Sequence, residues 1–325
     1  MKKISWQALR SAEIKAAKAN RHIRRTIKCD NGSLEIVRKS EIKGLVKKRP
    51  VNSHKGTFGK LLLIVGSDRY PGAAQLSTIA ALRSGVGLAS CLTTYNCALA
   101  AAVSAKEATF IPCPSDDEGF LLGDDKSISV LKASLASCTA VLIGCGIGKS
   151  DSTLRILKAV IENADCPIII DADGINLVSS CIELLRKART KVVLTPHVAE
   201  LSRMAGVDIQ TAIEQRYEIA KRISAETGAV VVSKSCATVI VSDDSECVCM
   251  YGNDGLSKGG SGDMLAGLIA SFCAQGIDVY SASKLGTTVL GVCCERVSRS
   301  LSKTGMTASD ILNYLPKLFK KIERA

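Results

Sequence analysis

The sequence predicts an α/β fold in which a mostly parallel β-sheet is covered by helices on both faces. Short apolar runs alternate with amphipathic stretches along most of the chain, an alternation typical of parallel strands joined by crossover helices. Most of the runs end in glycine or polar residues. The chain has 325 residues, of which 46% are apolar, so it can bury a sizeable core.

The first 40 residues are predicted to be a basic extension, partly helical or disordered. Residues 1–60 contain 17 Lys or Arg and 4 acidic residues, whereas residues 61–325 contain 26 and 27. The net charge of +12 therefore belongs to the N-terminal part. A solvated arm, a membrane-surface or partner helix and an organelle transit segment all fit this pattern.

The composition argues against several classes of protein. Residues 61–325 are electrically balanced and poor in aromatic side chains, so we expect no nucleic-acid binding. No apolar run approaches the about 18 residues of a membrane span, and no charged segment leads into an apolar one near the start, so we expect neither a membrane span nor a secretory signal. The 14 cysteines include no C-x-x-C pair, which favours free thiols in a reducing cytoplasm and no structural metal.

The elements can be assigned in chain order. Residues 28–53 are predicted to be a connector with one short strand at 34–37. Buried strands are predicted at residues 61–65, 88–93, 140–143, 168–170, 192–194 and 230–232, and helices at 73–82, 152–163, 209–225 and 264–272. No linker divides residues 54–325, so residues 41–325 are expected to form one domain. Because the carboxyl ends of parallel strands meet at one edge, we expect the ligand site there.

The segment 144–150, G-C-G-I-G-K-S, follows one of these strands and resembles two nucleotide motifs. A P-loop would require glycine at position 143, which is Ile, and a dinucleotide-binding turn would require glycine at 149, which is Lys. Neither motif is complete. A flexible turn for an anionic or planar ligand and a simple packing turn both remain open.

Three other strand ends carry residues that could contact a ligand. Asp171 and Asp173 could hold magnesium or substrate hydroxyls, or could serve only as turn residues. His197 follows the strand at 192–194, and a structural role is as compatible with the sequence as a functional one. Small residues after Tyr70 could admit a flat ring or allow close helix packing.

The most informative stretch is residues 253–263, N-D-G-L-S-K-G-G-S-G-D, which leads into an apolar helical pattern. Glycines permit positive φ, and the first amides of a helix lack internal partners and attract anions. We therefore predict an anion site formed by the backbone of Gly259, Gly260, Ser261 and Gly262. Asp263 beside it could be a helix cap, a general base for a hydroxyl that attacks phosphorus, or both.

Together these segments resemble the ADP-dependent NAD(P)H-hydrate dehydratases, which have the ribokinase-like fold. The matching segments are S-H-K-G-T-F-G (53–59), V-G-S-D (65–68), P-G-A-A (71–74), A-L-R-S-G-V-G-L (81–88), I-G-C-G-I-G (143–148), D-A-D-G-I-N (171–176), L-T-P-H (194–197), K-S-C-A-T (234–238) and G-N-D-G-L-S-K-G-G-S-G-D (252–263). The resemblance covers residues 41–325.

The resemblance implies repair of the S epimer of hydrated NADH or NADPH, with ADP or ATP as co-substrate. The 6-hydroxyl would be phosphorylated, with Asp263 as base, and elimination of phosphate would restore the coenzyme. It also implies that magnesium bridges the phosphates, that the protein is a homotetramer, and that a separate NAD(P)H-hydrate epimerase is a functional partner, because 40 residues cannot contain the epimerase domain often fused ahead of this one.

The resemblance also assigns residues to two subsites. Ala74, Gly146, His197 and Asp263 are expected to line the hydrate pocket. The nucleotide is expected to contact Gly262 and the segment Lys234, Ser235, Cys236, Ala237 and Thr238. Two positions depart from the family pattern, since Ser235 replaces a glycine and Cys145 replaces a proline.

Two other functions are compatible with the same motifs. A small-molecule kinase of this fold, of the hydroxyethylthiazole or vitamin kinase type, would stop at the phosphorylated alcohol. A non-catalytic sensor would bind the nucleotide without turnover.

Overall fold

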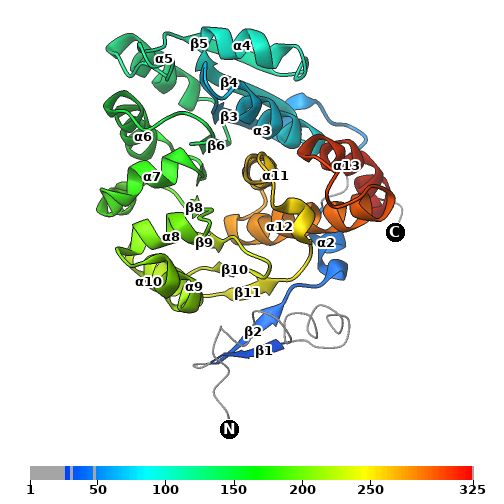
Figure 1. The fold of residues 1–325 in the computed structure, drawn as a ribbon. Coiled ribbons are helices and arrows are strands. Elements are labelled where there is room, and N and C mark those ends of the chain that lie inside the picture. Colours follow the sequence, from blue (N-terminus) through cyan, green and yellow to red (C-terminus); the bar gives the residue numbers. More distant parts are fainter. Residues whose placement is uncertain (1–25, 30–31, 47–48, 324–325) are drawn as a thin grey trace.

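A single eleven-stranded sheet runs through the protein, with the strand order β1-β2-β11-β10-β9-β8-β7-β6-β3-β4-β5 (Figure 1). The structure is a computed structural model and describes residues 26–29, 32–46 and 49–323. Antiparallel pairing is confined to β1–β2 and the β9–β10–β11 meander, and the other neighbouring strands are parallel. The predicted fold class, a mostly parallel sheet between two layers of helices, is confirmed.

The strands have the following bounds: β1 (Thr26–Cys29), β2 (Gly32–Ile36), β3 (Lys60–Ile64), β4 (Leu88–Thr94), β5 (Thr109–Cys113), β6 (Ala140–Ile143), β7 (Ile168–Ile170), β8 (Val192–Leu194), β9 (Val230–Ser233), β10 (Thr238–Val241) and β11 (Glu246–Cys249).

The helices have the following bounds: α2 (Lys39–Leu45), η2 (Lys55–Phe58), α3 (Pro71–Arg83), α4 (Tyr95–Ala102), α5 (Asp125–Leu135), α6 (Asp151–Asn163), α7 (Asp173–Ser179), η3 (Ile182–Lys187), α8 (Val198–Ala205), α9 (Ile209–Glu214), α10 (Arg216–Thr227), η4 (Asp254–Leu256), α11 (Ser261–Ala274), α12 (Val279–Ser300) and α13 (Ala308–Glu323). None of these helices combines the length and apolar character needed to cross a bilayer.

The core consists of two apolar layers, one on each face of the sheet. On β6, Val141 and Ile143 point into a layer formed with α5 to α10, whereas Ala140 and Leu142 point into a layer formed with α2, α3, α4 and α11 to α13. Successive side chains of a strand point to opposite faces, so a strand buried on both faces is apolar at every position. This is why β6, β7 and β8 are continuous apolar runs in the sequence.

The turns at the carboxyl ends of the parallel strands are bonded to one another. Gly66, after β3, donates its amide to the carbonyl of Cys145, after β6, at 2.7 Å. Lys234, after β9, donates its amide to the carbonyl of Pro196, after β8, at 2.8 Å. The sheet thereby brings the sequence motifs to one edge.

The predicted helix at 209–225 is interrupted. It consists of α9 and α10, separated at Gln215, whose backbone (φ −109, ψ 26) is not helical. The side chain of buried Arg216 donates to the carbonyl of Ala237 at 2.7 Å. A bond between remote segments leaves no local signal in the sequence, so periodicity alone predicts one helix.

The N-terminal region contributes more to the sheet than the prediction of one connecting strand suggests. β2 pairs in parallel with β11, and β1 pairs with β2, so the described part of residues 1–40 extends the same sheet. Leu34 and Ile36 of β2 are fully buried in the core. Most of the basic extension predicted for residues 1–40 lies outside the described residues, and the boundary after residue 40 stays a prediction.

Candidate active site

The amino terminus of α11 is open toward the edge where the strand-end turns meet. Gly260 is the N-cap residue, with φ 88, and no side chain caps this end. The first backbone bond of the helix runs from the amide of Met264 to the carbonyl of Gly260, at 3.1 Å. The amides of Gly262 and Asp263 precede this bond and have no acceptor within the helix. Amides so placed attract anions. Of the four residues predicted to form an anion site, Gly262 has such an amide, whereas the amide of Ser261 donates to the carbonyl of Lys258 at 3.4 Å.

Asp263 lies in the first turn of α11 and is largely enclosed. Burial raises the pKa of its carboxyl to about 6, and the negative charge of Asp171 acts in the same direction. A hydrogen bond from the Cys145 thiol and the charge of Lys234 oppose the shift. Because the N-cap is Gly260, Asp263 does not cap the helix. Its pKa near neutrality suits a general base.

Asp171 and Lys234 form a buried ion pair beside Asp263. The Lys234 Nζ lies 2.7 Å from the Asp171 Oδ1, which also accepts a bond from the Thr195 hydroxyl at 2.7 Å. Burial alone would raise the pKa of Asp171, but the Lys234 ammonium and these hydrogen bonds outweigh it and hold the pKa below its ordinary value. Both groups are therefore charged at neutral pH.

The carboxylates of Asp171 and Asp173 do not bind at one common site. Ala172 between them has φ 50, the only positive φ of a non-glycine residue in the described chain. Asp173 begins α7, and its carboxylate accepts the amide of Gly148 at 3.0 Å. Asp173 is thus a turn residue, whereas Asp171 belongs to the polar cluster. A strained backbone at this point is consistent with a functional site.

His197 and Glu200 continue the polar cluster on the far side of Lys234. The His197 Nδ1 accepts the amides of Ala199 and Glu200, so its Nε2 carries the proton and lies 3.2 Å from the Glu200 Oε1. The Glu200 Oε2 lies 3.9 Å from the Lys234 Nζ. Burial raises the pKa of Glu200 to about 7, and burial and Lys234 lower the pKa of His197. His197 is half-exposed and serves as the N-cap of α8.

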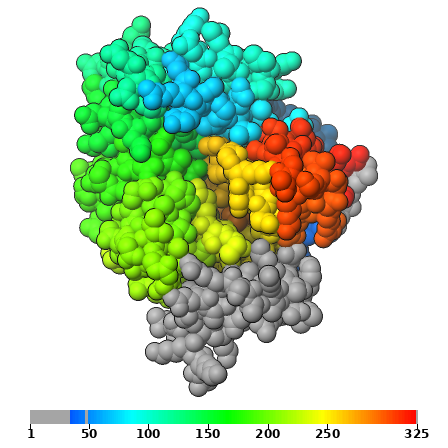
Figure 2. Space-filling model, viewed as in Figure 1, coloured from blue at the N-terminus to red at the C-terminus, as the bar shows by residue number. Residues whose placement is uncertain are grey.

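A cavity of about 420 Å³ opens directly on Asp263. It is lined by Arg69, Tyr70, Pro71, Gly72, Ala73, Leu76, Gly146, Gly260 and Asp263. Figure 2 shows the surrounding surface, where the yellow residues near 250–263 lie between the N-terminal, middle and C-terminal parts of the chain. The lining of the cavity thus includes both the start of α11, at Gly260 and Asp263, and the start of α3.

The predicted site residues occupy different positions around this cavity. Gly146 and Asp263 line it directly, whereas Ala74 is fully buried and packs next to Gly66, and its neighbour Ala73 faces the cavity. A Cβ atom built on Gly262 would lie 3.5 Å from both the Asp171 Oδ2 and the Lys234 Nζ. Gly262 thus faces the ion pair.

The segment 234–238 forms the tight turn between β9 and β10. The Thr238 hydroxyl accepts the amide of Ser235 at 3.4 Å and donates to its carbonyl at 3.1 Å. Ser235 has no positive φ, so a serine fits the turn in place of the glycine. Ser235 and Cys236 are exposed or nearly so, while Ala237 is buried. Only part of this segment can touch a ligand.

One group of side chains in the described chain has the spacing of a metal site. The ligand atoms of Cys145, Asp171 and Asp263 lie within 4.8 Å of one another. A thiol is a poor ligand for magnesium, and the Lys234 ammonium occupies one oxygen of Asp171. This cluster does not fit magnesium.

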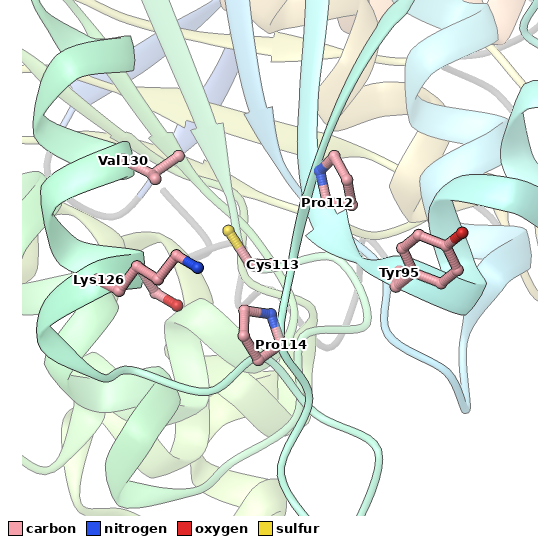
Figure 3. A pocket seen from close by; sticks show the side chains of 7 residues that line it. Tyr95, Pro112, Cys113, Pro114, Lys126 and Val130 are labelled. Atoms are coloured by element: carbon pink, nitrogen blue, oxygen red, sulfur yellow. The ribbon is translucent and has the colours of Figure 1, made fainter.

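Sequence reasoning missed several residues of the site. Arg69 and Leu76 line the cavity without belonging to a distinctive motif, whereas Tyr70 begins the turn that the sequence indicates as a place for a flat ring. Cys145 is noticed only as a departure from the family pattern, yet its thiol lies 3.7 Å from the Asp171 Oδ2. A smaller pocket of about 310 Å³ lies between β5, α4 and α5, where Lys126 and Tyr95 flank Cys113 (Figure 3).

Comparison with known proteins supports the predicted fold and family. A sequence model of the family described as NAD(P)H-hydrate dehydratase matches residues 61–317. The ADP-dependent (S)-NAD(P)H-hydrate dehydratase of Bacillus subtilis is 31% identical over 283 residues, which are 87% of this chain and 96% of that protein. The crystal structure of the Bacillus subtilis ADP/ATP-dependent enzyme, co-crystallised with ATP/Mg2+, has a TM-score of 0.76 and 29% identity, covering 89% of this chain and 99% of that one.

Some relatives are longer. The bifunctional NAD(P)H-hydrate repair enzyme Nnr of Thermofilum pendens is 30% identical over 279 residues, which are 86% of this chain and 53% of that protein. The chain spans about half of the length of this and similar bifunctional relatives.

The sheet and the solved structures that it resembles define a protein with the ribokinase-like fold. Within that class, the match over residues 61–317 is specific. The chain belongs to the NAD(P)H-hydrate dehydratase family, as the sequence motifs predict.

Proposed function

We propose that the protein dehydrates the S epimer of NADH or NADPH hydrate, using ADP as phosphoryl donor. The observation that carries this proposal is Asp263, a carboxyl with a pKa of about 6 between a cavity and the free amides of a helix terminus. Family membership supplies the substrate class. ATP is an alternative donor, since a relative was crystallised with it.

In the proposed reaction, Asp263 takes the proton of the substrate 6-hydroxyl as the hydroxyl oxygen attacks the terminal phosphorus of the nucleotide. The amides at the start of α11 receive the negative charge that develops on the transferred phosphoryl group. The shortened nucleotide leaves, and the phosphate ester then eliminates phosphate, which restores the ring double bond. Removing one such amide donor typically costs about 10² to 10³ in rate.

In this proposal the Lys234 ammonium, held by Asp171, supplies positive charge where the nucleotide phosphates bind. Lys234 is held by Asp171 and faces Gly262, so its ammonium lies next to the amides that would bind phosphate. Burial favours the neutral amine, but the charges of Asp171 and Glu200 outweigh it and raise the pKa of Lys234. A permanently charged lysine can hold a phosphate oxygen as a point charge.

The hydrated nicotinamide would occupy the cavity lined by Gly146 and Tyr70, with its hydroxyl toward Asp263. The nucleotide would lie over Gly262 and Lys234, continuing along the exposed part of the 234–238 turn. Ala74 would act by shaping α3, and His197 by holding Glu200 against Lys234. Magnesium would arrive bound to the phosphates and shield their charge, since the described side chains do not form a magnesium cage of their own.

The proposal also covers the location, the oligomeric state and the functional partner of the protein. We expect a cytoplasmic homotetramer with an NAD(P)H-hydrate epimerase as functional partner, as the resemblance of the sequence to this family implies. The epimerase reaction would convert the R epimer into the form that this site accepts.

The test is recovery of reduced nicotinamide absorbance when the protein is incubated with NADPH hydrate, ADP and magnesium. We expect wild type and Asp208→Asn to restore the absorbance and Asp263→Asn to be inactive. Asp208 is a suitable control because it caps α9 with the same kind of carboxylate. A kinase would consume nucleotide without restoring absorbance, and a sensor would bind nucleotide without turnover; either result would reject the proposal.

A further inference from the structure

Two thiols at the edge of the sheet opposite the proposed active site lie close together. The Sγ atoms of Cys138 and Cys166 are 3.4 Å apart, and either thiol can donate to the other. Cys138 lies just before β6, and Cys166 just before the neighbouring strand β7.

We propose that Cys138 and Cys166 are a redox modification site, which hydroperoxides convert into an intramolecular disulfide. Peroxide oxidises the Cys138 thiol to a sulfenic acid and leaves as water or alcohol. The Cys166 sulfur then attacks the Cys138 sulfur, a second water is released, and the disulfide forms. The two electrons go to the peroxide, so the step needs no other co-reactant.

The backbone geometry permits this bond. β6 and β7 are adjacent parallel strands in which Val141 is paired with Ile168. Extending that register places Cys138 one residue away from the position opposite Cys166. A strand spacing of about 4.8 Å and a rise of about 3.3 Å per residue then give a Cα separation of about 6 Å, within the about 4.4–6.8 Å that disulfides span. The sulfurs need to approach by only about 1.4 Å to reach bonding distance. Side-chain rotation alone can supply that movement.

The two thiols differ in a way that assigns their roles. Cys138 is partly exposed, whereas Cys166 is buried. The hydrogen bond from Cys166 lowers the pKa of Cys138, and the same contact and burial raise the pKa of Cys166. The thiolate is the form that reacts with peroxide. Cys138 is therefore the thiol that reacts with peroxide first, and Cys166 is the thiol that attacks the resulting sulfenic acid.

A cavity of about 240 Å³ gives access to the pair. It is lined by Lys132, Leu135, Ala136, Cys138, Asn163, Asp165 and Cys166. Both sulfurs thus face the same space, which is large enough for a peroxide molecule. The most exposed cysteine of the described chain, Cys236, has no such enclosure or sulfur partner.

The test is oxidation of the reduced full-length protein with graded hydrogen peroxide, followed by alkylation and tryptic peptide mapping under non-reducing conditions. Lys149, Arg155 and Lys158 separate the two cysteines, so a disulfide links two peptides. We expect the 138–166 link at about one tenth of the peroxide dose that oxidises the other thiols. Dithiothreitol should reverse it.

The tryptic peptide with Cys138 also contains Cys145, and the peptide with Cys166 also contains Cys181. Variants are therefore needed to show which cysteines in the two linked peptides form the disulfide. Cys181→Ser is the matched variant, since Cys181 is also half-buried and also bonds to a backbone carbonyl. The link should persist in Cys181→Ser and disappear in Cys138→Ser. If Cys138→Ser does not fold, Cys166→Ala replaces it.

A second readout tests the consequence for the fold. The disulfide would close a loop between the starts of two central strands, so the oxidised wild type should unfold at a temperature about 5 °C higher. Cys138→Ser should show no such rise. Sulfinic acid without a cross-link, a cross-link that survives in Cys138→Ser, or equal peroxide sensitivity of all thiols would overturn the proposal.

Discussion

Asp263 is placed so that its protonation governs the proposed reaction. Burial raises the pKa of its carboxyl to about 6, and the base is competent only when it has lost its proton. We therefore predict that kcat rises with pH through about 6 and then levels off, and that at pH 5 it is about tenfold lower than at pH 7. The measurement is the pH profile of coenzyme recovery, with Asp208→Asn as control. A profile that is flat from pH 5 to pH 8 would exclude Asp263 as the base.

The same shift predicts that Asp263→Asn does not destabilise the protein at neutral pH. A carboxyl whose pKa is higher in the folded than in the unfolded chain binds its proton more tightly when folded, so its contribution to stability falls as the pH rises from about 4 to 6. Asparagine removes that cost. At pH 7.5 the free energy of unfolding of Asp263→Asn should equal or exceed that of wild type by up to about 3 kcal/mol.

Denaturant unfolding at several pH values measures this difference. The advantage of the variant should be small near pH 4 and vanish below about pH 3, where the aspartate is protonated in both states. Glu200 also has a raised pKa, about 7, but it is present in both proteins and cancels in the comparison. A variant markedly less stable at pH 7.5 would mean that the carboxylate is a structural group.

Which residues form the site could be predicted only in part. Asp263 and the glycines before it are recognisable because cap, turn and helix follow one another in the sequence. The pairing of Lys234 with Asp171 joins positions 63 residues apart and depends on the order of the strands, which a local pattern does not contain. Glu200 looks like a helix-start residue in sequence, and only its distance to Lys234 shows that it completes the charged cluster.

At the scale of an element, the space beside the first amides of α11 is open because the residues there are glycines. A Cβ atom on Gly262 would be at ordinary contact distance, 3.5 Å, from the Asp171 and Lys234 side chains. We predict that Gly262→Ala folds normally but raises the KM for ADP about tenfold or more, because the methyl group occupies space next to the phosphate-binding amides. Steady-state kinetics and thermal unfolding test this.

The matched control for Gly262→Ala is Gly44→Ala in α2. A Cβ atom there would meet nothing within 4 Å, and α2 is a regular helix away from the cavity. Its KM should stay within twofold of wild type. If Gly262→Ala and Gly44→Ala bind ADP equally well, the start of α11 does not hold the nucleotide phosphates.

Helices and strands could be predicted from the sequence where burial alone determines the residue pattern. β6, β7 and β8 are buried on both faces, so their apolar runs mark them without ambiguity. β10 and β11 form an antiparallel hairpin whose position depends on pairing with β9 and β2. The break at Gln215 is likewise set by tertiary contacts and not by proline or glycine.

At the scale of the whole molecule, the sheet edge explains why distant motifs converge. The strands β3 to β9 are parallel, so the turns after β3, β6, β7, β8 and β9 all reach the same edge, and α11 is packed against it. That convergence follows from the predicted fold class. The strand predicted at 34–37 overlaps β2, but its parallel pairing with β11 does not follow from the fold class, because the partner of a short strand leaves no local signal in the sequence.

The last prediction concerns those strands. β2 lies at the opposite side of the sheet from the cavity, next to β11, and buries Leu34 and Ile36. Deleting residues 1–37 should leave kcat within about twofold of wild type but lower the free energy of unfolding by about 3 kcal/mol or more, because two large core side chains are lost and the β11 edge is exposed.

The comparison that makes this decisive is a deletion of residues 1–25, which retains β1 and β2. It should match wild type in both kcat and unfolding free energy, as measured by denaturant titration. Equal stability of the two truncated proteins would mean that β2 does not belong to the folded core. Loss of kcat in the longer deletion, with the fold intact by circular dichroism, would mean instead that the N-terminal strands act on the site through α12, which packs against α2 and α11.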